Sequence, residues 1–209
     1  MRPRKNTIKY FAGLALLVGS CAVNAGLIKN GSFDTNLDHW DVDFGIQGTG
    51  VTWDSGQARV GQPGPDGFAS LSQSFSIAAG TSSLSVNFDY EWQVEKPTKP
   101  DFFTAILSYD TVGGGTTTHN LLGTAPNGQS SNDVDFLTTY SYSGTFALTD
   151  LLDAPMNGLI SFKLIEDNGT SRGTRVHVDN VSVSVPEPSI LALFGLGLFG
   201  LGFARRRKI

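Results

Sequence analysis

Carboxylates are the side chains in this sequence best placed for catalysis. Asp89, Glu91 and Glu95 alternate with apolar residues, so on a β-strand they would share one face. Two carboxylates on either side of a glycosidic bond can hydrolyse it. Acidic residues on the solvent-facing side of a strand are far more often simply solvated. Glycoside hydrolysis is therefore the third of three functional hypotheses.

Other catalytic chemistries lack the required residue spacing. His39, His119 and His177 are scattered, without the HExxH spacing that places two zinc ligands on one helix face. The GxxxxGK loop that binds phosphate groups is also absent from the sequence. We therefore predict that the protein is not an enzyme.

Aromatic residues supply candidates for a polysaccharide-binding site. Such a site needs exposed rings that stack on sugars, beside polar groups that hydrogen-bond hydroxyls. Trp53, Tyr140 and Tyr142 are these candidates, because they lie in strand-like or loop-like segments without a clear burial pattern. The alternative for each ring is packing in the core or at its rim.

The charge distribution narrows the range of partners. Eight of the fifteen Lys and Arg residues lie at the two ends of the chain. The remaining seven accompany all nineteen Asp and Glu residues, which gives residues 26–204 a net charge of −12. Such a surface repels phosphate backbones, so we expect no nucleic-acid partner. Neutral glycans and divalent cations remain compatible with it.

The elements that must position these residues are β-strands. In the stretch 84–95, polar residues alternate without a break with Leu84, Val86, Phe88, Tyr90, Trp92 and Val94. Period two over this length predicts a long strand with one buried and one solvated face. Further alternating segments are separated by Gly-rich breaks such as "TVGGGTTTH". We predict an all-β fold, an antiparallel β-sandwich of the jelly-roll type, over residues 26–185.

The last predicted strand contains an irregularity. Val176 and Val178 share one parity, whereas Val181 and Val183 share the other. The phase slips by one residue at Asp179-Asn180, which predicts a β-bulge. A bulge re-aims a side chain, here the carboxylate of Asp179.

Two segments, one near the N-terminus and one in the last predicted strand, share a pattern with a known fold. Its residues are Asn30, Gly31, Phe33, Asp34, Trp40, Asp179, Asn180 and Val181. They resemble galactose-binding-like jelly rolls, a fold shared by many carbohydrate-binding modules, with Asp34 in place of the commoner Glu. The resemblance implies that the first and last strands lie side by side. It also implies a structural Ca²⁺ between them, for which Asp34 and Asp179 are the expected ligands.

The N-terminus has the features of a secretory signal peptide. Basic residues precede the apolar stretch 11–18, and small residues precede an expected cleavage by signal peptidase after Ala25. Residues 1–25 are therefore assigned to this signal. Ser20-Cys21 also loosely matches a lipoprotein cleavage box, and lipidation of Cys21 remains an alternative.

The C-terminus combines three parts. Pro186, Glu187 and Pro188 precede the apolar segment 189–204, which would span about 24 Å as a helix. The basic tail 205–209 follows, with Arg205, Arg206, Arg207 and Lys208 as the membrane stop. Because these cations do not cross a bilayer cheaply, they are expected to stay in the cytoplasm, with the preceding domain on the outer side of the membrane.

This arrangement resembles the PEP-CTERM proteins of Gram-negative bacteria. The resemblance implies recognition of residues 186–188 by a membrane-embedded exosortase, an inner-membrane intermediate, and delivery to the cell surface or extracellular matrix. Members of the family are commonly associated with exopolysaccharide in biofilms and flocs. The leading hypothesis is a non-catalytic domain that binds or organises extracellular polysaccharide. The alternative is a structural or adhesive envelope protein without a glycan site.

Overall fold

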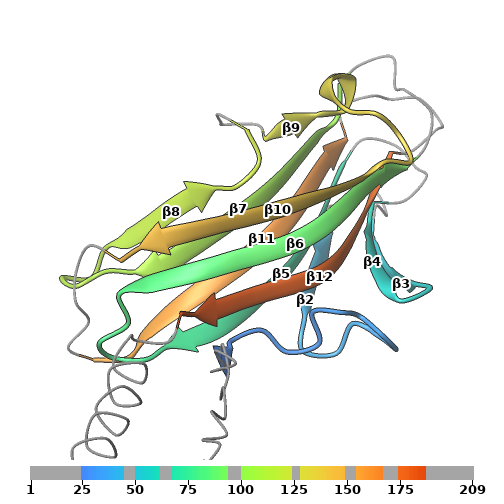
Figure 1. Cartoon of the computed structure of the whole chain (residues 1–209). Coiled ribbons are helices and arrows are strands. Elements are labelled where there is room, and N and C mark those ends of the chain that lie inside the picture. Colours follow the sequence, from blue (N-terminus) through green and yellow to red (C-terminus); the bar gives the residue numbers. More distant parts are fainter. Residues whose placement is uncertain are drawn as a thin grey trace, which may run out of the picture. The chain divides into compact units, whose positions relative to one another are not determined.

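Figure 1 shows a computed structural model of the chain, which describes residues 25–44, 50–61, 67–93, 100–123, 128–148, 154–166 and 174–186. These residues form β-strands and one short 3₁₀-helix, η1 (Ser131–Asp133), and contain no α-helix. No helix able to cross a membrane was found within them. Several predictions concern residues outside the described ranges. They are the signal peptide before Ala25 (Cys21 among its residues), Glu95, Glu187, Pro188, the transmembrane helix 189–204 and the basic tail 205–209.

Sheet A forms the layer that carries the long alternating strand. Its strand order is β10 (Thr139–Ala147), β6 (Ser83–Gln93), β12 (Arg175–Val185), β4 (Gln57–Val60) and β3 (Val51–Asp54), and β1 (Ala25–Gly26) also pairs with β12. All of these pairings are antiparallel. The segment expected to be one long strand is therefore β6, which lies between β10 and β12.

Sheet B forms the second layer. Its order is β2 (Asp41–Phe44), β5 (Gly67–Ile77), β11 (Met156–Glu166), β7 (Phe102–Asp110) and β8 (Thr116–Asn120), and β9 (Gln129–Ser130) also pairs with β7. These pairings are antiparallel as well. The predicted all-β antiparallel sandwich of the jelly-roll type is confirmed.

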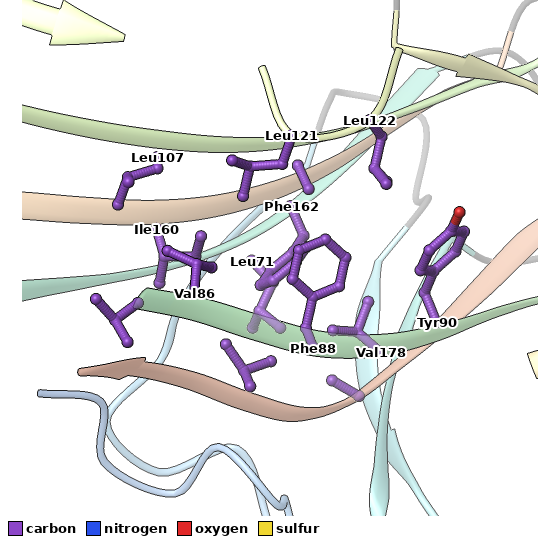
Figure 2. Packing of buried hydrophobic residues seen from close by; sticks show 14 of the residues in the cluster. Leu71, Val86, Phe88, Tyr90, Leu107, Leu121, Leu122, Ile160, Phe162 and Val178 are labelled. Atoms are coloured by element: carbon purple, nitrogen blue, oxygen red, sulfur yellow. The ribbon is translucent and has the colours of Figure 1, made fainter. Parts of the chain in front are cut away.

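The hydrophobic core lies between the two sheets, because each long strand turns one face inward. Along β6 the inward residues Leu84, Val86, Phe88, Tyr90 and Trp92 are buried, while their neighbours are half-buried. Figure 2 shows Val86 and Phe88 of this strand beside Leu71, Ile160 and Phe162 of sheet B. The predicted core position of Trp92 is confirmed, since it is fully buried and its indole Nε1 donates to Gln129 Oε1 over 3.1 Å.

The core is contained within one part of the chain. Residues Asn24–Pro186 form one compact unit. The described hydrophobic residues that build or cover the core all lie between Leu27 and Val185. The segment 24–186 thus contains the interactions that stabilise the sandwich, and it is expected to fold on its own.

The N-terminal segment lies along β12. Beyond the β1–β12 pair, Leu27 N donates to Val183 O over 2.7 Å, and Val181 N donates to Gly31 O over 2.8 Å. A Cβ atom on Gly31 would lie 1.9 Å from Val181 O, so only glycine permits this approach of the two backbones. The expected proximity of the first and last strands is confirmed.

The predicted β-bulge is also confirmed. The register between β12 and β6 shifts between Asp179 and Ser182, and Asn180 has a left-handed φ of 51°. Asparagine tolerates this conformation better than most residues do. The bulge lets Val178 and Val181, which lie on opposite parities of the sequence, both point into the core.

Candidate functional site

The outward side of sheet A is the candidate functional site, and we call it the polar face. One row of side chains crosses the sheet through the paired residues Thr139, Glu91, His177, Arg59 and Thr52. A second row contains Ser141, Asp89, Asp179, Gln57 and Asp54. These residues share one face because they alternate with the buried residues of the same strands.

Hydrogen bonds hold the carboxylates of β6 in place. Asp89 accepts from Ser141 Oγ over 2.6 Å and from Asn180 Nδ2 over 2.8 Å, one bond to each oxygen. Glu91 accepts from Gln93 Nε2 over 2.8 Å and from Thr139 Oγ1 over 3.2 Å, again one to each oxygen. These two acids therefore act as fixed acceptors that link β10, β6 and β12.

Asp54, Arg59 and His177 form a polar cluster at the β3 side of the polar face. Asp54 Oδ2 lies 3.7 Å from Arg59 Nη1 and 3.7 Å from His177 Nε2. The side chains of Asp54 and Arg59 are 37% and 23% exposed, whereas that of His177 is only 8% exposed. Asp54 and Arg59 are thus accessible to a ligand, whereas His177 is buried beside Asp54.

Burial controls the protonation of His177. Desolvation lowers the pKa of this imidazole, and the positive charges of Arg175 and Arg59 lower it further. The carboxylates of Asp54 and Glu91 oppose this shift. The net lowering means that His177 is neutral at neutral pH.

Several buried polar atoms on this side of sheet A lack a hydrogen-bond partner among the described residues. They are Thr52 Oγ1, Arg59 Nε, Arg175 Nε and His177 Nε2. A buried polar atom without a hydrogen bond costs about 1–3 kcal/mol, and most native structures contain few of them. Their concentration around one cluster is therefore a feature that packing of the core does not explain.

The three aromatic candidates from the sequence occupy two different environments. Tyr140 stacks on Tyr90 at 5.3 Å, and Tyr142 stacks on Phe88 at 5.0 Å, so both rings pack at the rim of the core. Trp53 lies on the edge strand β3 and is 43% exposed. Its Nε1 donates to Phe33 O over 2.6 Å. Because Trp53 alternates with Thr52 and Asp54 along β3, its ring lies on the side of that strand opposite to the polar face. Ligand stacking by these residues stays a prediction, and Trp53 has the exposure that it requires.

The two predicted calcium ligands, Asp34 and Asp179, lie close enough for the charge of Asp34 to affect the pKa of Asp179. Burial raises the pKa of Asp179, and the carboxylates of Asp89 and Asp34 raise it further, against the hydrogen bonds from Asn180 and Gln57. Asp34 Oδ2 accepts from Ser32 Oγ over 2.9 Å.

The chemistry of this donor set is suitable for calcium but incomplete. Calcium takes six to eight oxygen ligands, and two carboxylates supply up to four. The described residues contain no group of three His, Cys, Asp or Glu side chains able to hold a metal ion. Backbone carbonyls and water would have to complete the coordination, so calcium stays a prediction.

Sequence reasoning did not identify the cluster of Asp54, Arg59 and His177. The three residues come from three strands, and only the strand order β12-β4-β3 brings them together. A scattered histidine gives no sequence signal of such an arrangement. The alternation of Gln57-Ala58-Arg59-Val60 does indicate which of these residues point outward.

Comparisons with known proteins identify the C-terminal motif. Residues 184–208 match the family model of the PEP-CTERM protein-sorting motif. No curated protein matches the chain.

Solved structures with a similar arrangement include carbohydrate-binding domains. TmCBM61, solved in complex with β-1,4-galactotriose, is 13% identical with a TM-score of 0.47, and the match covers 77% of this chain and 99% of that one. The N-terminal cellulose-binding domain of Cellulomonas fimi β-1,4-glucanase C is 14% identical with a TM-score of 0.46, covering 78% and 99%. The enzymatically active domain of bacteriophage CBA120 tailspike protein 4 is 14% identical with a TM-score of 0.47. That match covers 77% of this chain but only 21% of the tailspike chain.

Asp179→Asn in the segment 24–186 separates charge repulsion from calcium binding. Because the folded-state pKa of Asp179 is raised, its ionised form is less favourable in the folded than in the unfolded state. With chelator at neutral pH, the substitution should therefore raise the melting temperature. Calcium should raise the melting temperature of the unchanged domain by binding the native state, and Asp179→Asn should abolish that increase.

Asp135→Asn, at an exposed acid next to β10, is the matched control and should keep the calcium effect. Identical melting curves of the unchanged domain with calcium and with chelator would contradict the calcium site. A lower melting temperature of Asp179→Asn in chelator would contradict the repulsion.

Proposed function

We propose that this is an exported cell-surface protein of a Gram-negative bacterium whose non-catalytic sandwich domain binds extracellular polysaccharide. The observation that carries the proposal is the match of residues 184–208 to the PEP-CTERM protein-sorting motif. In this proposal, signal peptidase removes residues 1–25 and the apolar segment 189–204 holds an inner-membrane intermediate. An exosortase then acts at Pro186-Glu187-Pro188. The protein reaches the cell surface or the matrix of a biofilm or floc.

The polar face supports the binding part of the proposal. Sugar hydroxyls both donate and accept hydrogen bonds, and the face offers fixed carboxylate acceptors at Asp89 and Glu91 and a guanidinium donor at Arg59. Trp53 supplies an exposed aromatic surface at the edge of the same sheet, on the side of β3 opposite to the polar face. A carbohydrate site needs both polar groups and aromatic surface. The acidic domain is compatible with a neutral polysaccharide.

A structural or adhesive envelope protein is the second candidate function. It is favoured by the hydrogen bonds that Asp89 and Glu91 already accept, one at each of their four oxygens, from neighbouring side chains. On this alternative the network only stabilises the sheet. The same hydrogen bonds make glycoside hydrolysis a weaker third candidate, because they hold both carboxylates as acceptors within the sheet.

Glu187→Ala tests the sorting step in cells of the organism that carries the gene. Loss of the carboxylate between the two prolines should leave a full-length precursor in the inner membrane and deplete the surface fraction. Asp153→Ala, which removes an acidic residue outside the motif, is the control and should be sorted normally. Mass spectrometry of both fractions provides the measurement. A surface protein that retains Arg205–Lys208 in unsubstituted cells would overturn the sorting proposal.

Binding of the segment 24–186 to polysaccharides tests the proposed polysaccharide binding. The probes are β-1,4-galactan, cellulose and xylan oligosaccharides and the exopolysaccharide extracted from the producing organism. We expect binding to at least one of them, weakened at least about tenfold by Trp53→Ala, because stacking and desolvation at one anchor contribute about 1.4 kcal/mol or more. Isothermal titration calorimetry provides the affinities.

Val112→Ala is the matched control, since Val112 is an exposed apolar residue in the turn between β7 and β8, outside sheet A. Its affinity should equal that of the unchanged domain. Failure of the unchanged domain to bind any probe would favour the structural alternative and leave the sorting result unaffected.

A further inference from the structure

The free edges of the two sheets differ in how they are protected against pairing with a strand of another chain. At the ends of the strand order lie β3, β2 and β8, which have four, four and five residues, and β10, which has nine. β2 carries Asp41 and Asp43, and β3 carries Asp54. Short length and charge are two devices that prevent an edge strand from pairing with another chain. Both are missing from β10.

β10 has the composition of a strand that can accept a neighbour. Its sequence, TYSYSGTFA, contains no charged residue and no proline. One edge pairs with β6 along its whole length, and within the described residues no strand pairs with the other edge. Its backbone N–H and C=O groups on that side are therefore available to a further strand.

We propose that β10 is the contact strand of a symmetric homodimer, in which β10 of one molecule pairs antiparallel with β10 of a second copy. A two-fold axis perpendicular to the sheet keeps the buried face of both copies on the same side. With the axis at Ser143, the centre of the strand, all nine residues find a partner. The two copies of sheet A then form one continuous sheet.

The side chains of β10 are self-complementary in this register. On the inward side, Tyr140 lies opposite Phe146 of the second copy, an aromatic pair of the kind that stabilises neighbouring strands. Tyr142 lies opposite Gly144 of the second copy. Each Gly144 is already covered by the Tyr142 ring of its own strand, since a Cβ there would lie 2.5 Å from the hydroxyl oxygen.

The outward side of the strand is also compatible with self-pairing. The hydroxyl-bearing residues Ser141 and Thr145 lie opposite each other, and Ser143 lies opposite its own copy; all three are exposed. No like-charged pair arises along the contact, although each domain is strongly acidic overall. A second copy of this chain is thus the occupant that the edge fits, and this inference is independent of the proposed polysaccharide binding.

Sedimentation velocity of the segment 24–186 over a range of concentrations tests the proposal. The unchanged domain should show a concentration-dependent dimer. Ser143→Lys should be monomeric, because it places two ammonium groups opposite each other on the solvent side. At concentrations low enough for the unchanged domain to be monomeric too, the two melting temperatures should be equal. Ser74→Lys should remain dimeric, since Ser74 is an exposed serine of β5, which lies between β2 and β11.

Mixing two variants tests the position of the axis. Ser143→Glu alone should also be monomeric, whereas an equimolar mixture of Ser143→Lys and Ser143→Glu should restore a mixed dimer through opposite charges. An unchanged domain that is monomeric at every concentration would overturn the proposal. A dimer that persists in Ser143→Lys, or a charge mixture that stays monomeric, would overturn it equally.

Discussion

The backbone contact between Gly31 and Val181 is the constraint on which the arrangement of sheet A depends. The bulge that ends at Ser182 changes the parity of β12, so that valines on both sides of it reach the core. A bulge leaves backbone groups without a ladder partner, and here Val181 N is satisfied by Gly31 O. The N-terminal segment thereby completes the sheet at the point where the regular pairing fails.

The regular pairing that ends at this bulge determines what lies on the polar face. It places Asp179 opposite Asp89, a like-charged pair that is unfavourable across neighbouring strands. Asn180 relieves this conflict, since its backbone N–H donates to Asp179 and its side-chain amide donates to Asp89. Asn180 makes both bonds from a left-handed backbone conformation. The two acids are thus accommodated on the polar face that also carries Arg59 and His177.

Much of this fold was predictable from the sequence because period-two alternation is a local property. The stretch from Leu84 to Trp92 shows its two faces without reference to any other strand, and the change of parity after Val178 marks the bulge. The cluster of Asp54, Arg59 and His177 was not predictable, because strand order is a long-range property. The rim positions of Tyr140 and Tyr142 likewise follow from their pairing with Tyr90 and Phe88.

The free energy of unfolding of Gly31→Ala in the segment 24–186 tests this account most directly. The added Cβ would meet the backbone oxygen of Val181, so the N-terminal segment must move away from the bulge. We expect a loss of at least about 2 kcal/mol, typical of overpacking combined with a lost buried hydrogen bond. Gly26→Ala, whose Cβ has no neighbour within 4 Å, should change stability by less than about 0.5 kcal/mol. Equal stabilities of the two variants would contradict the central role of this contact.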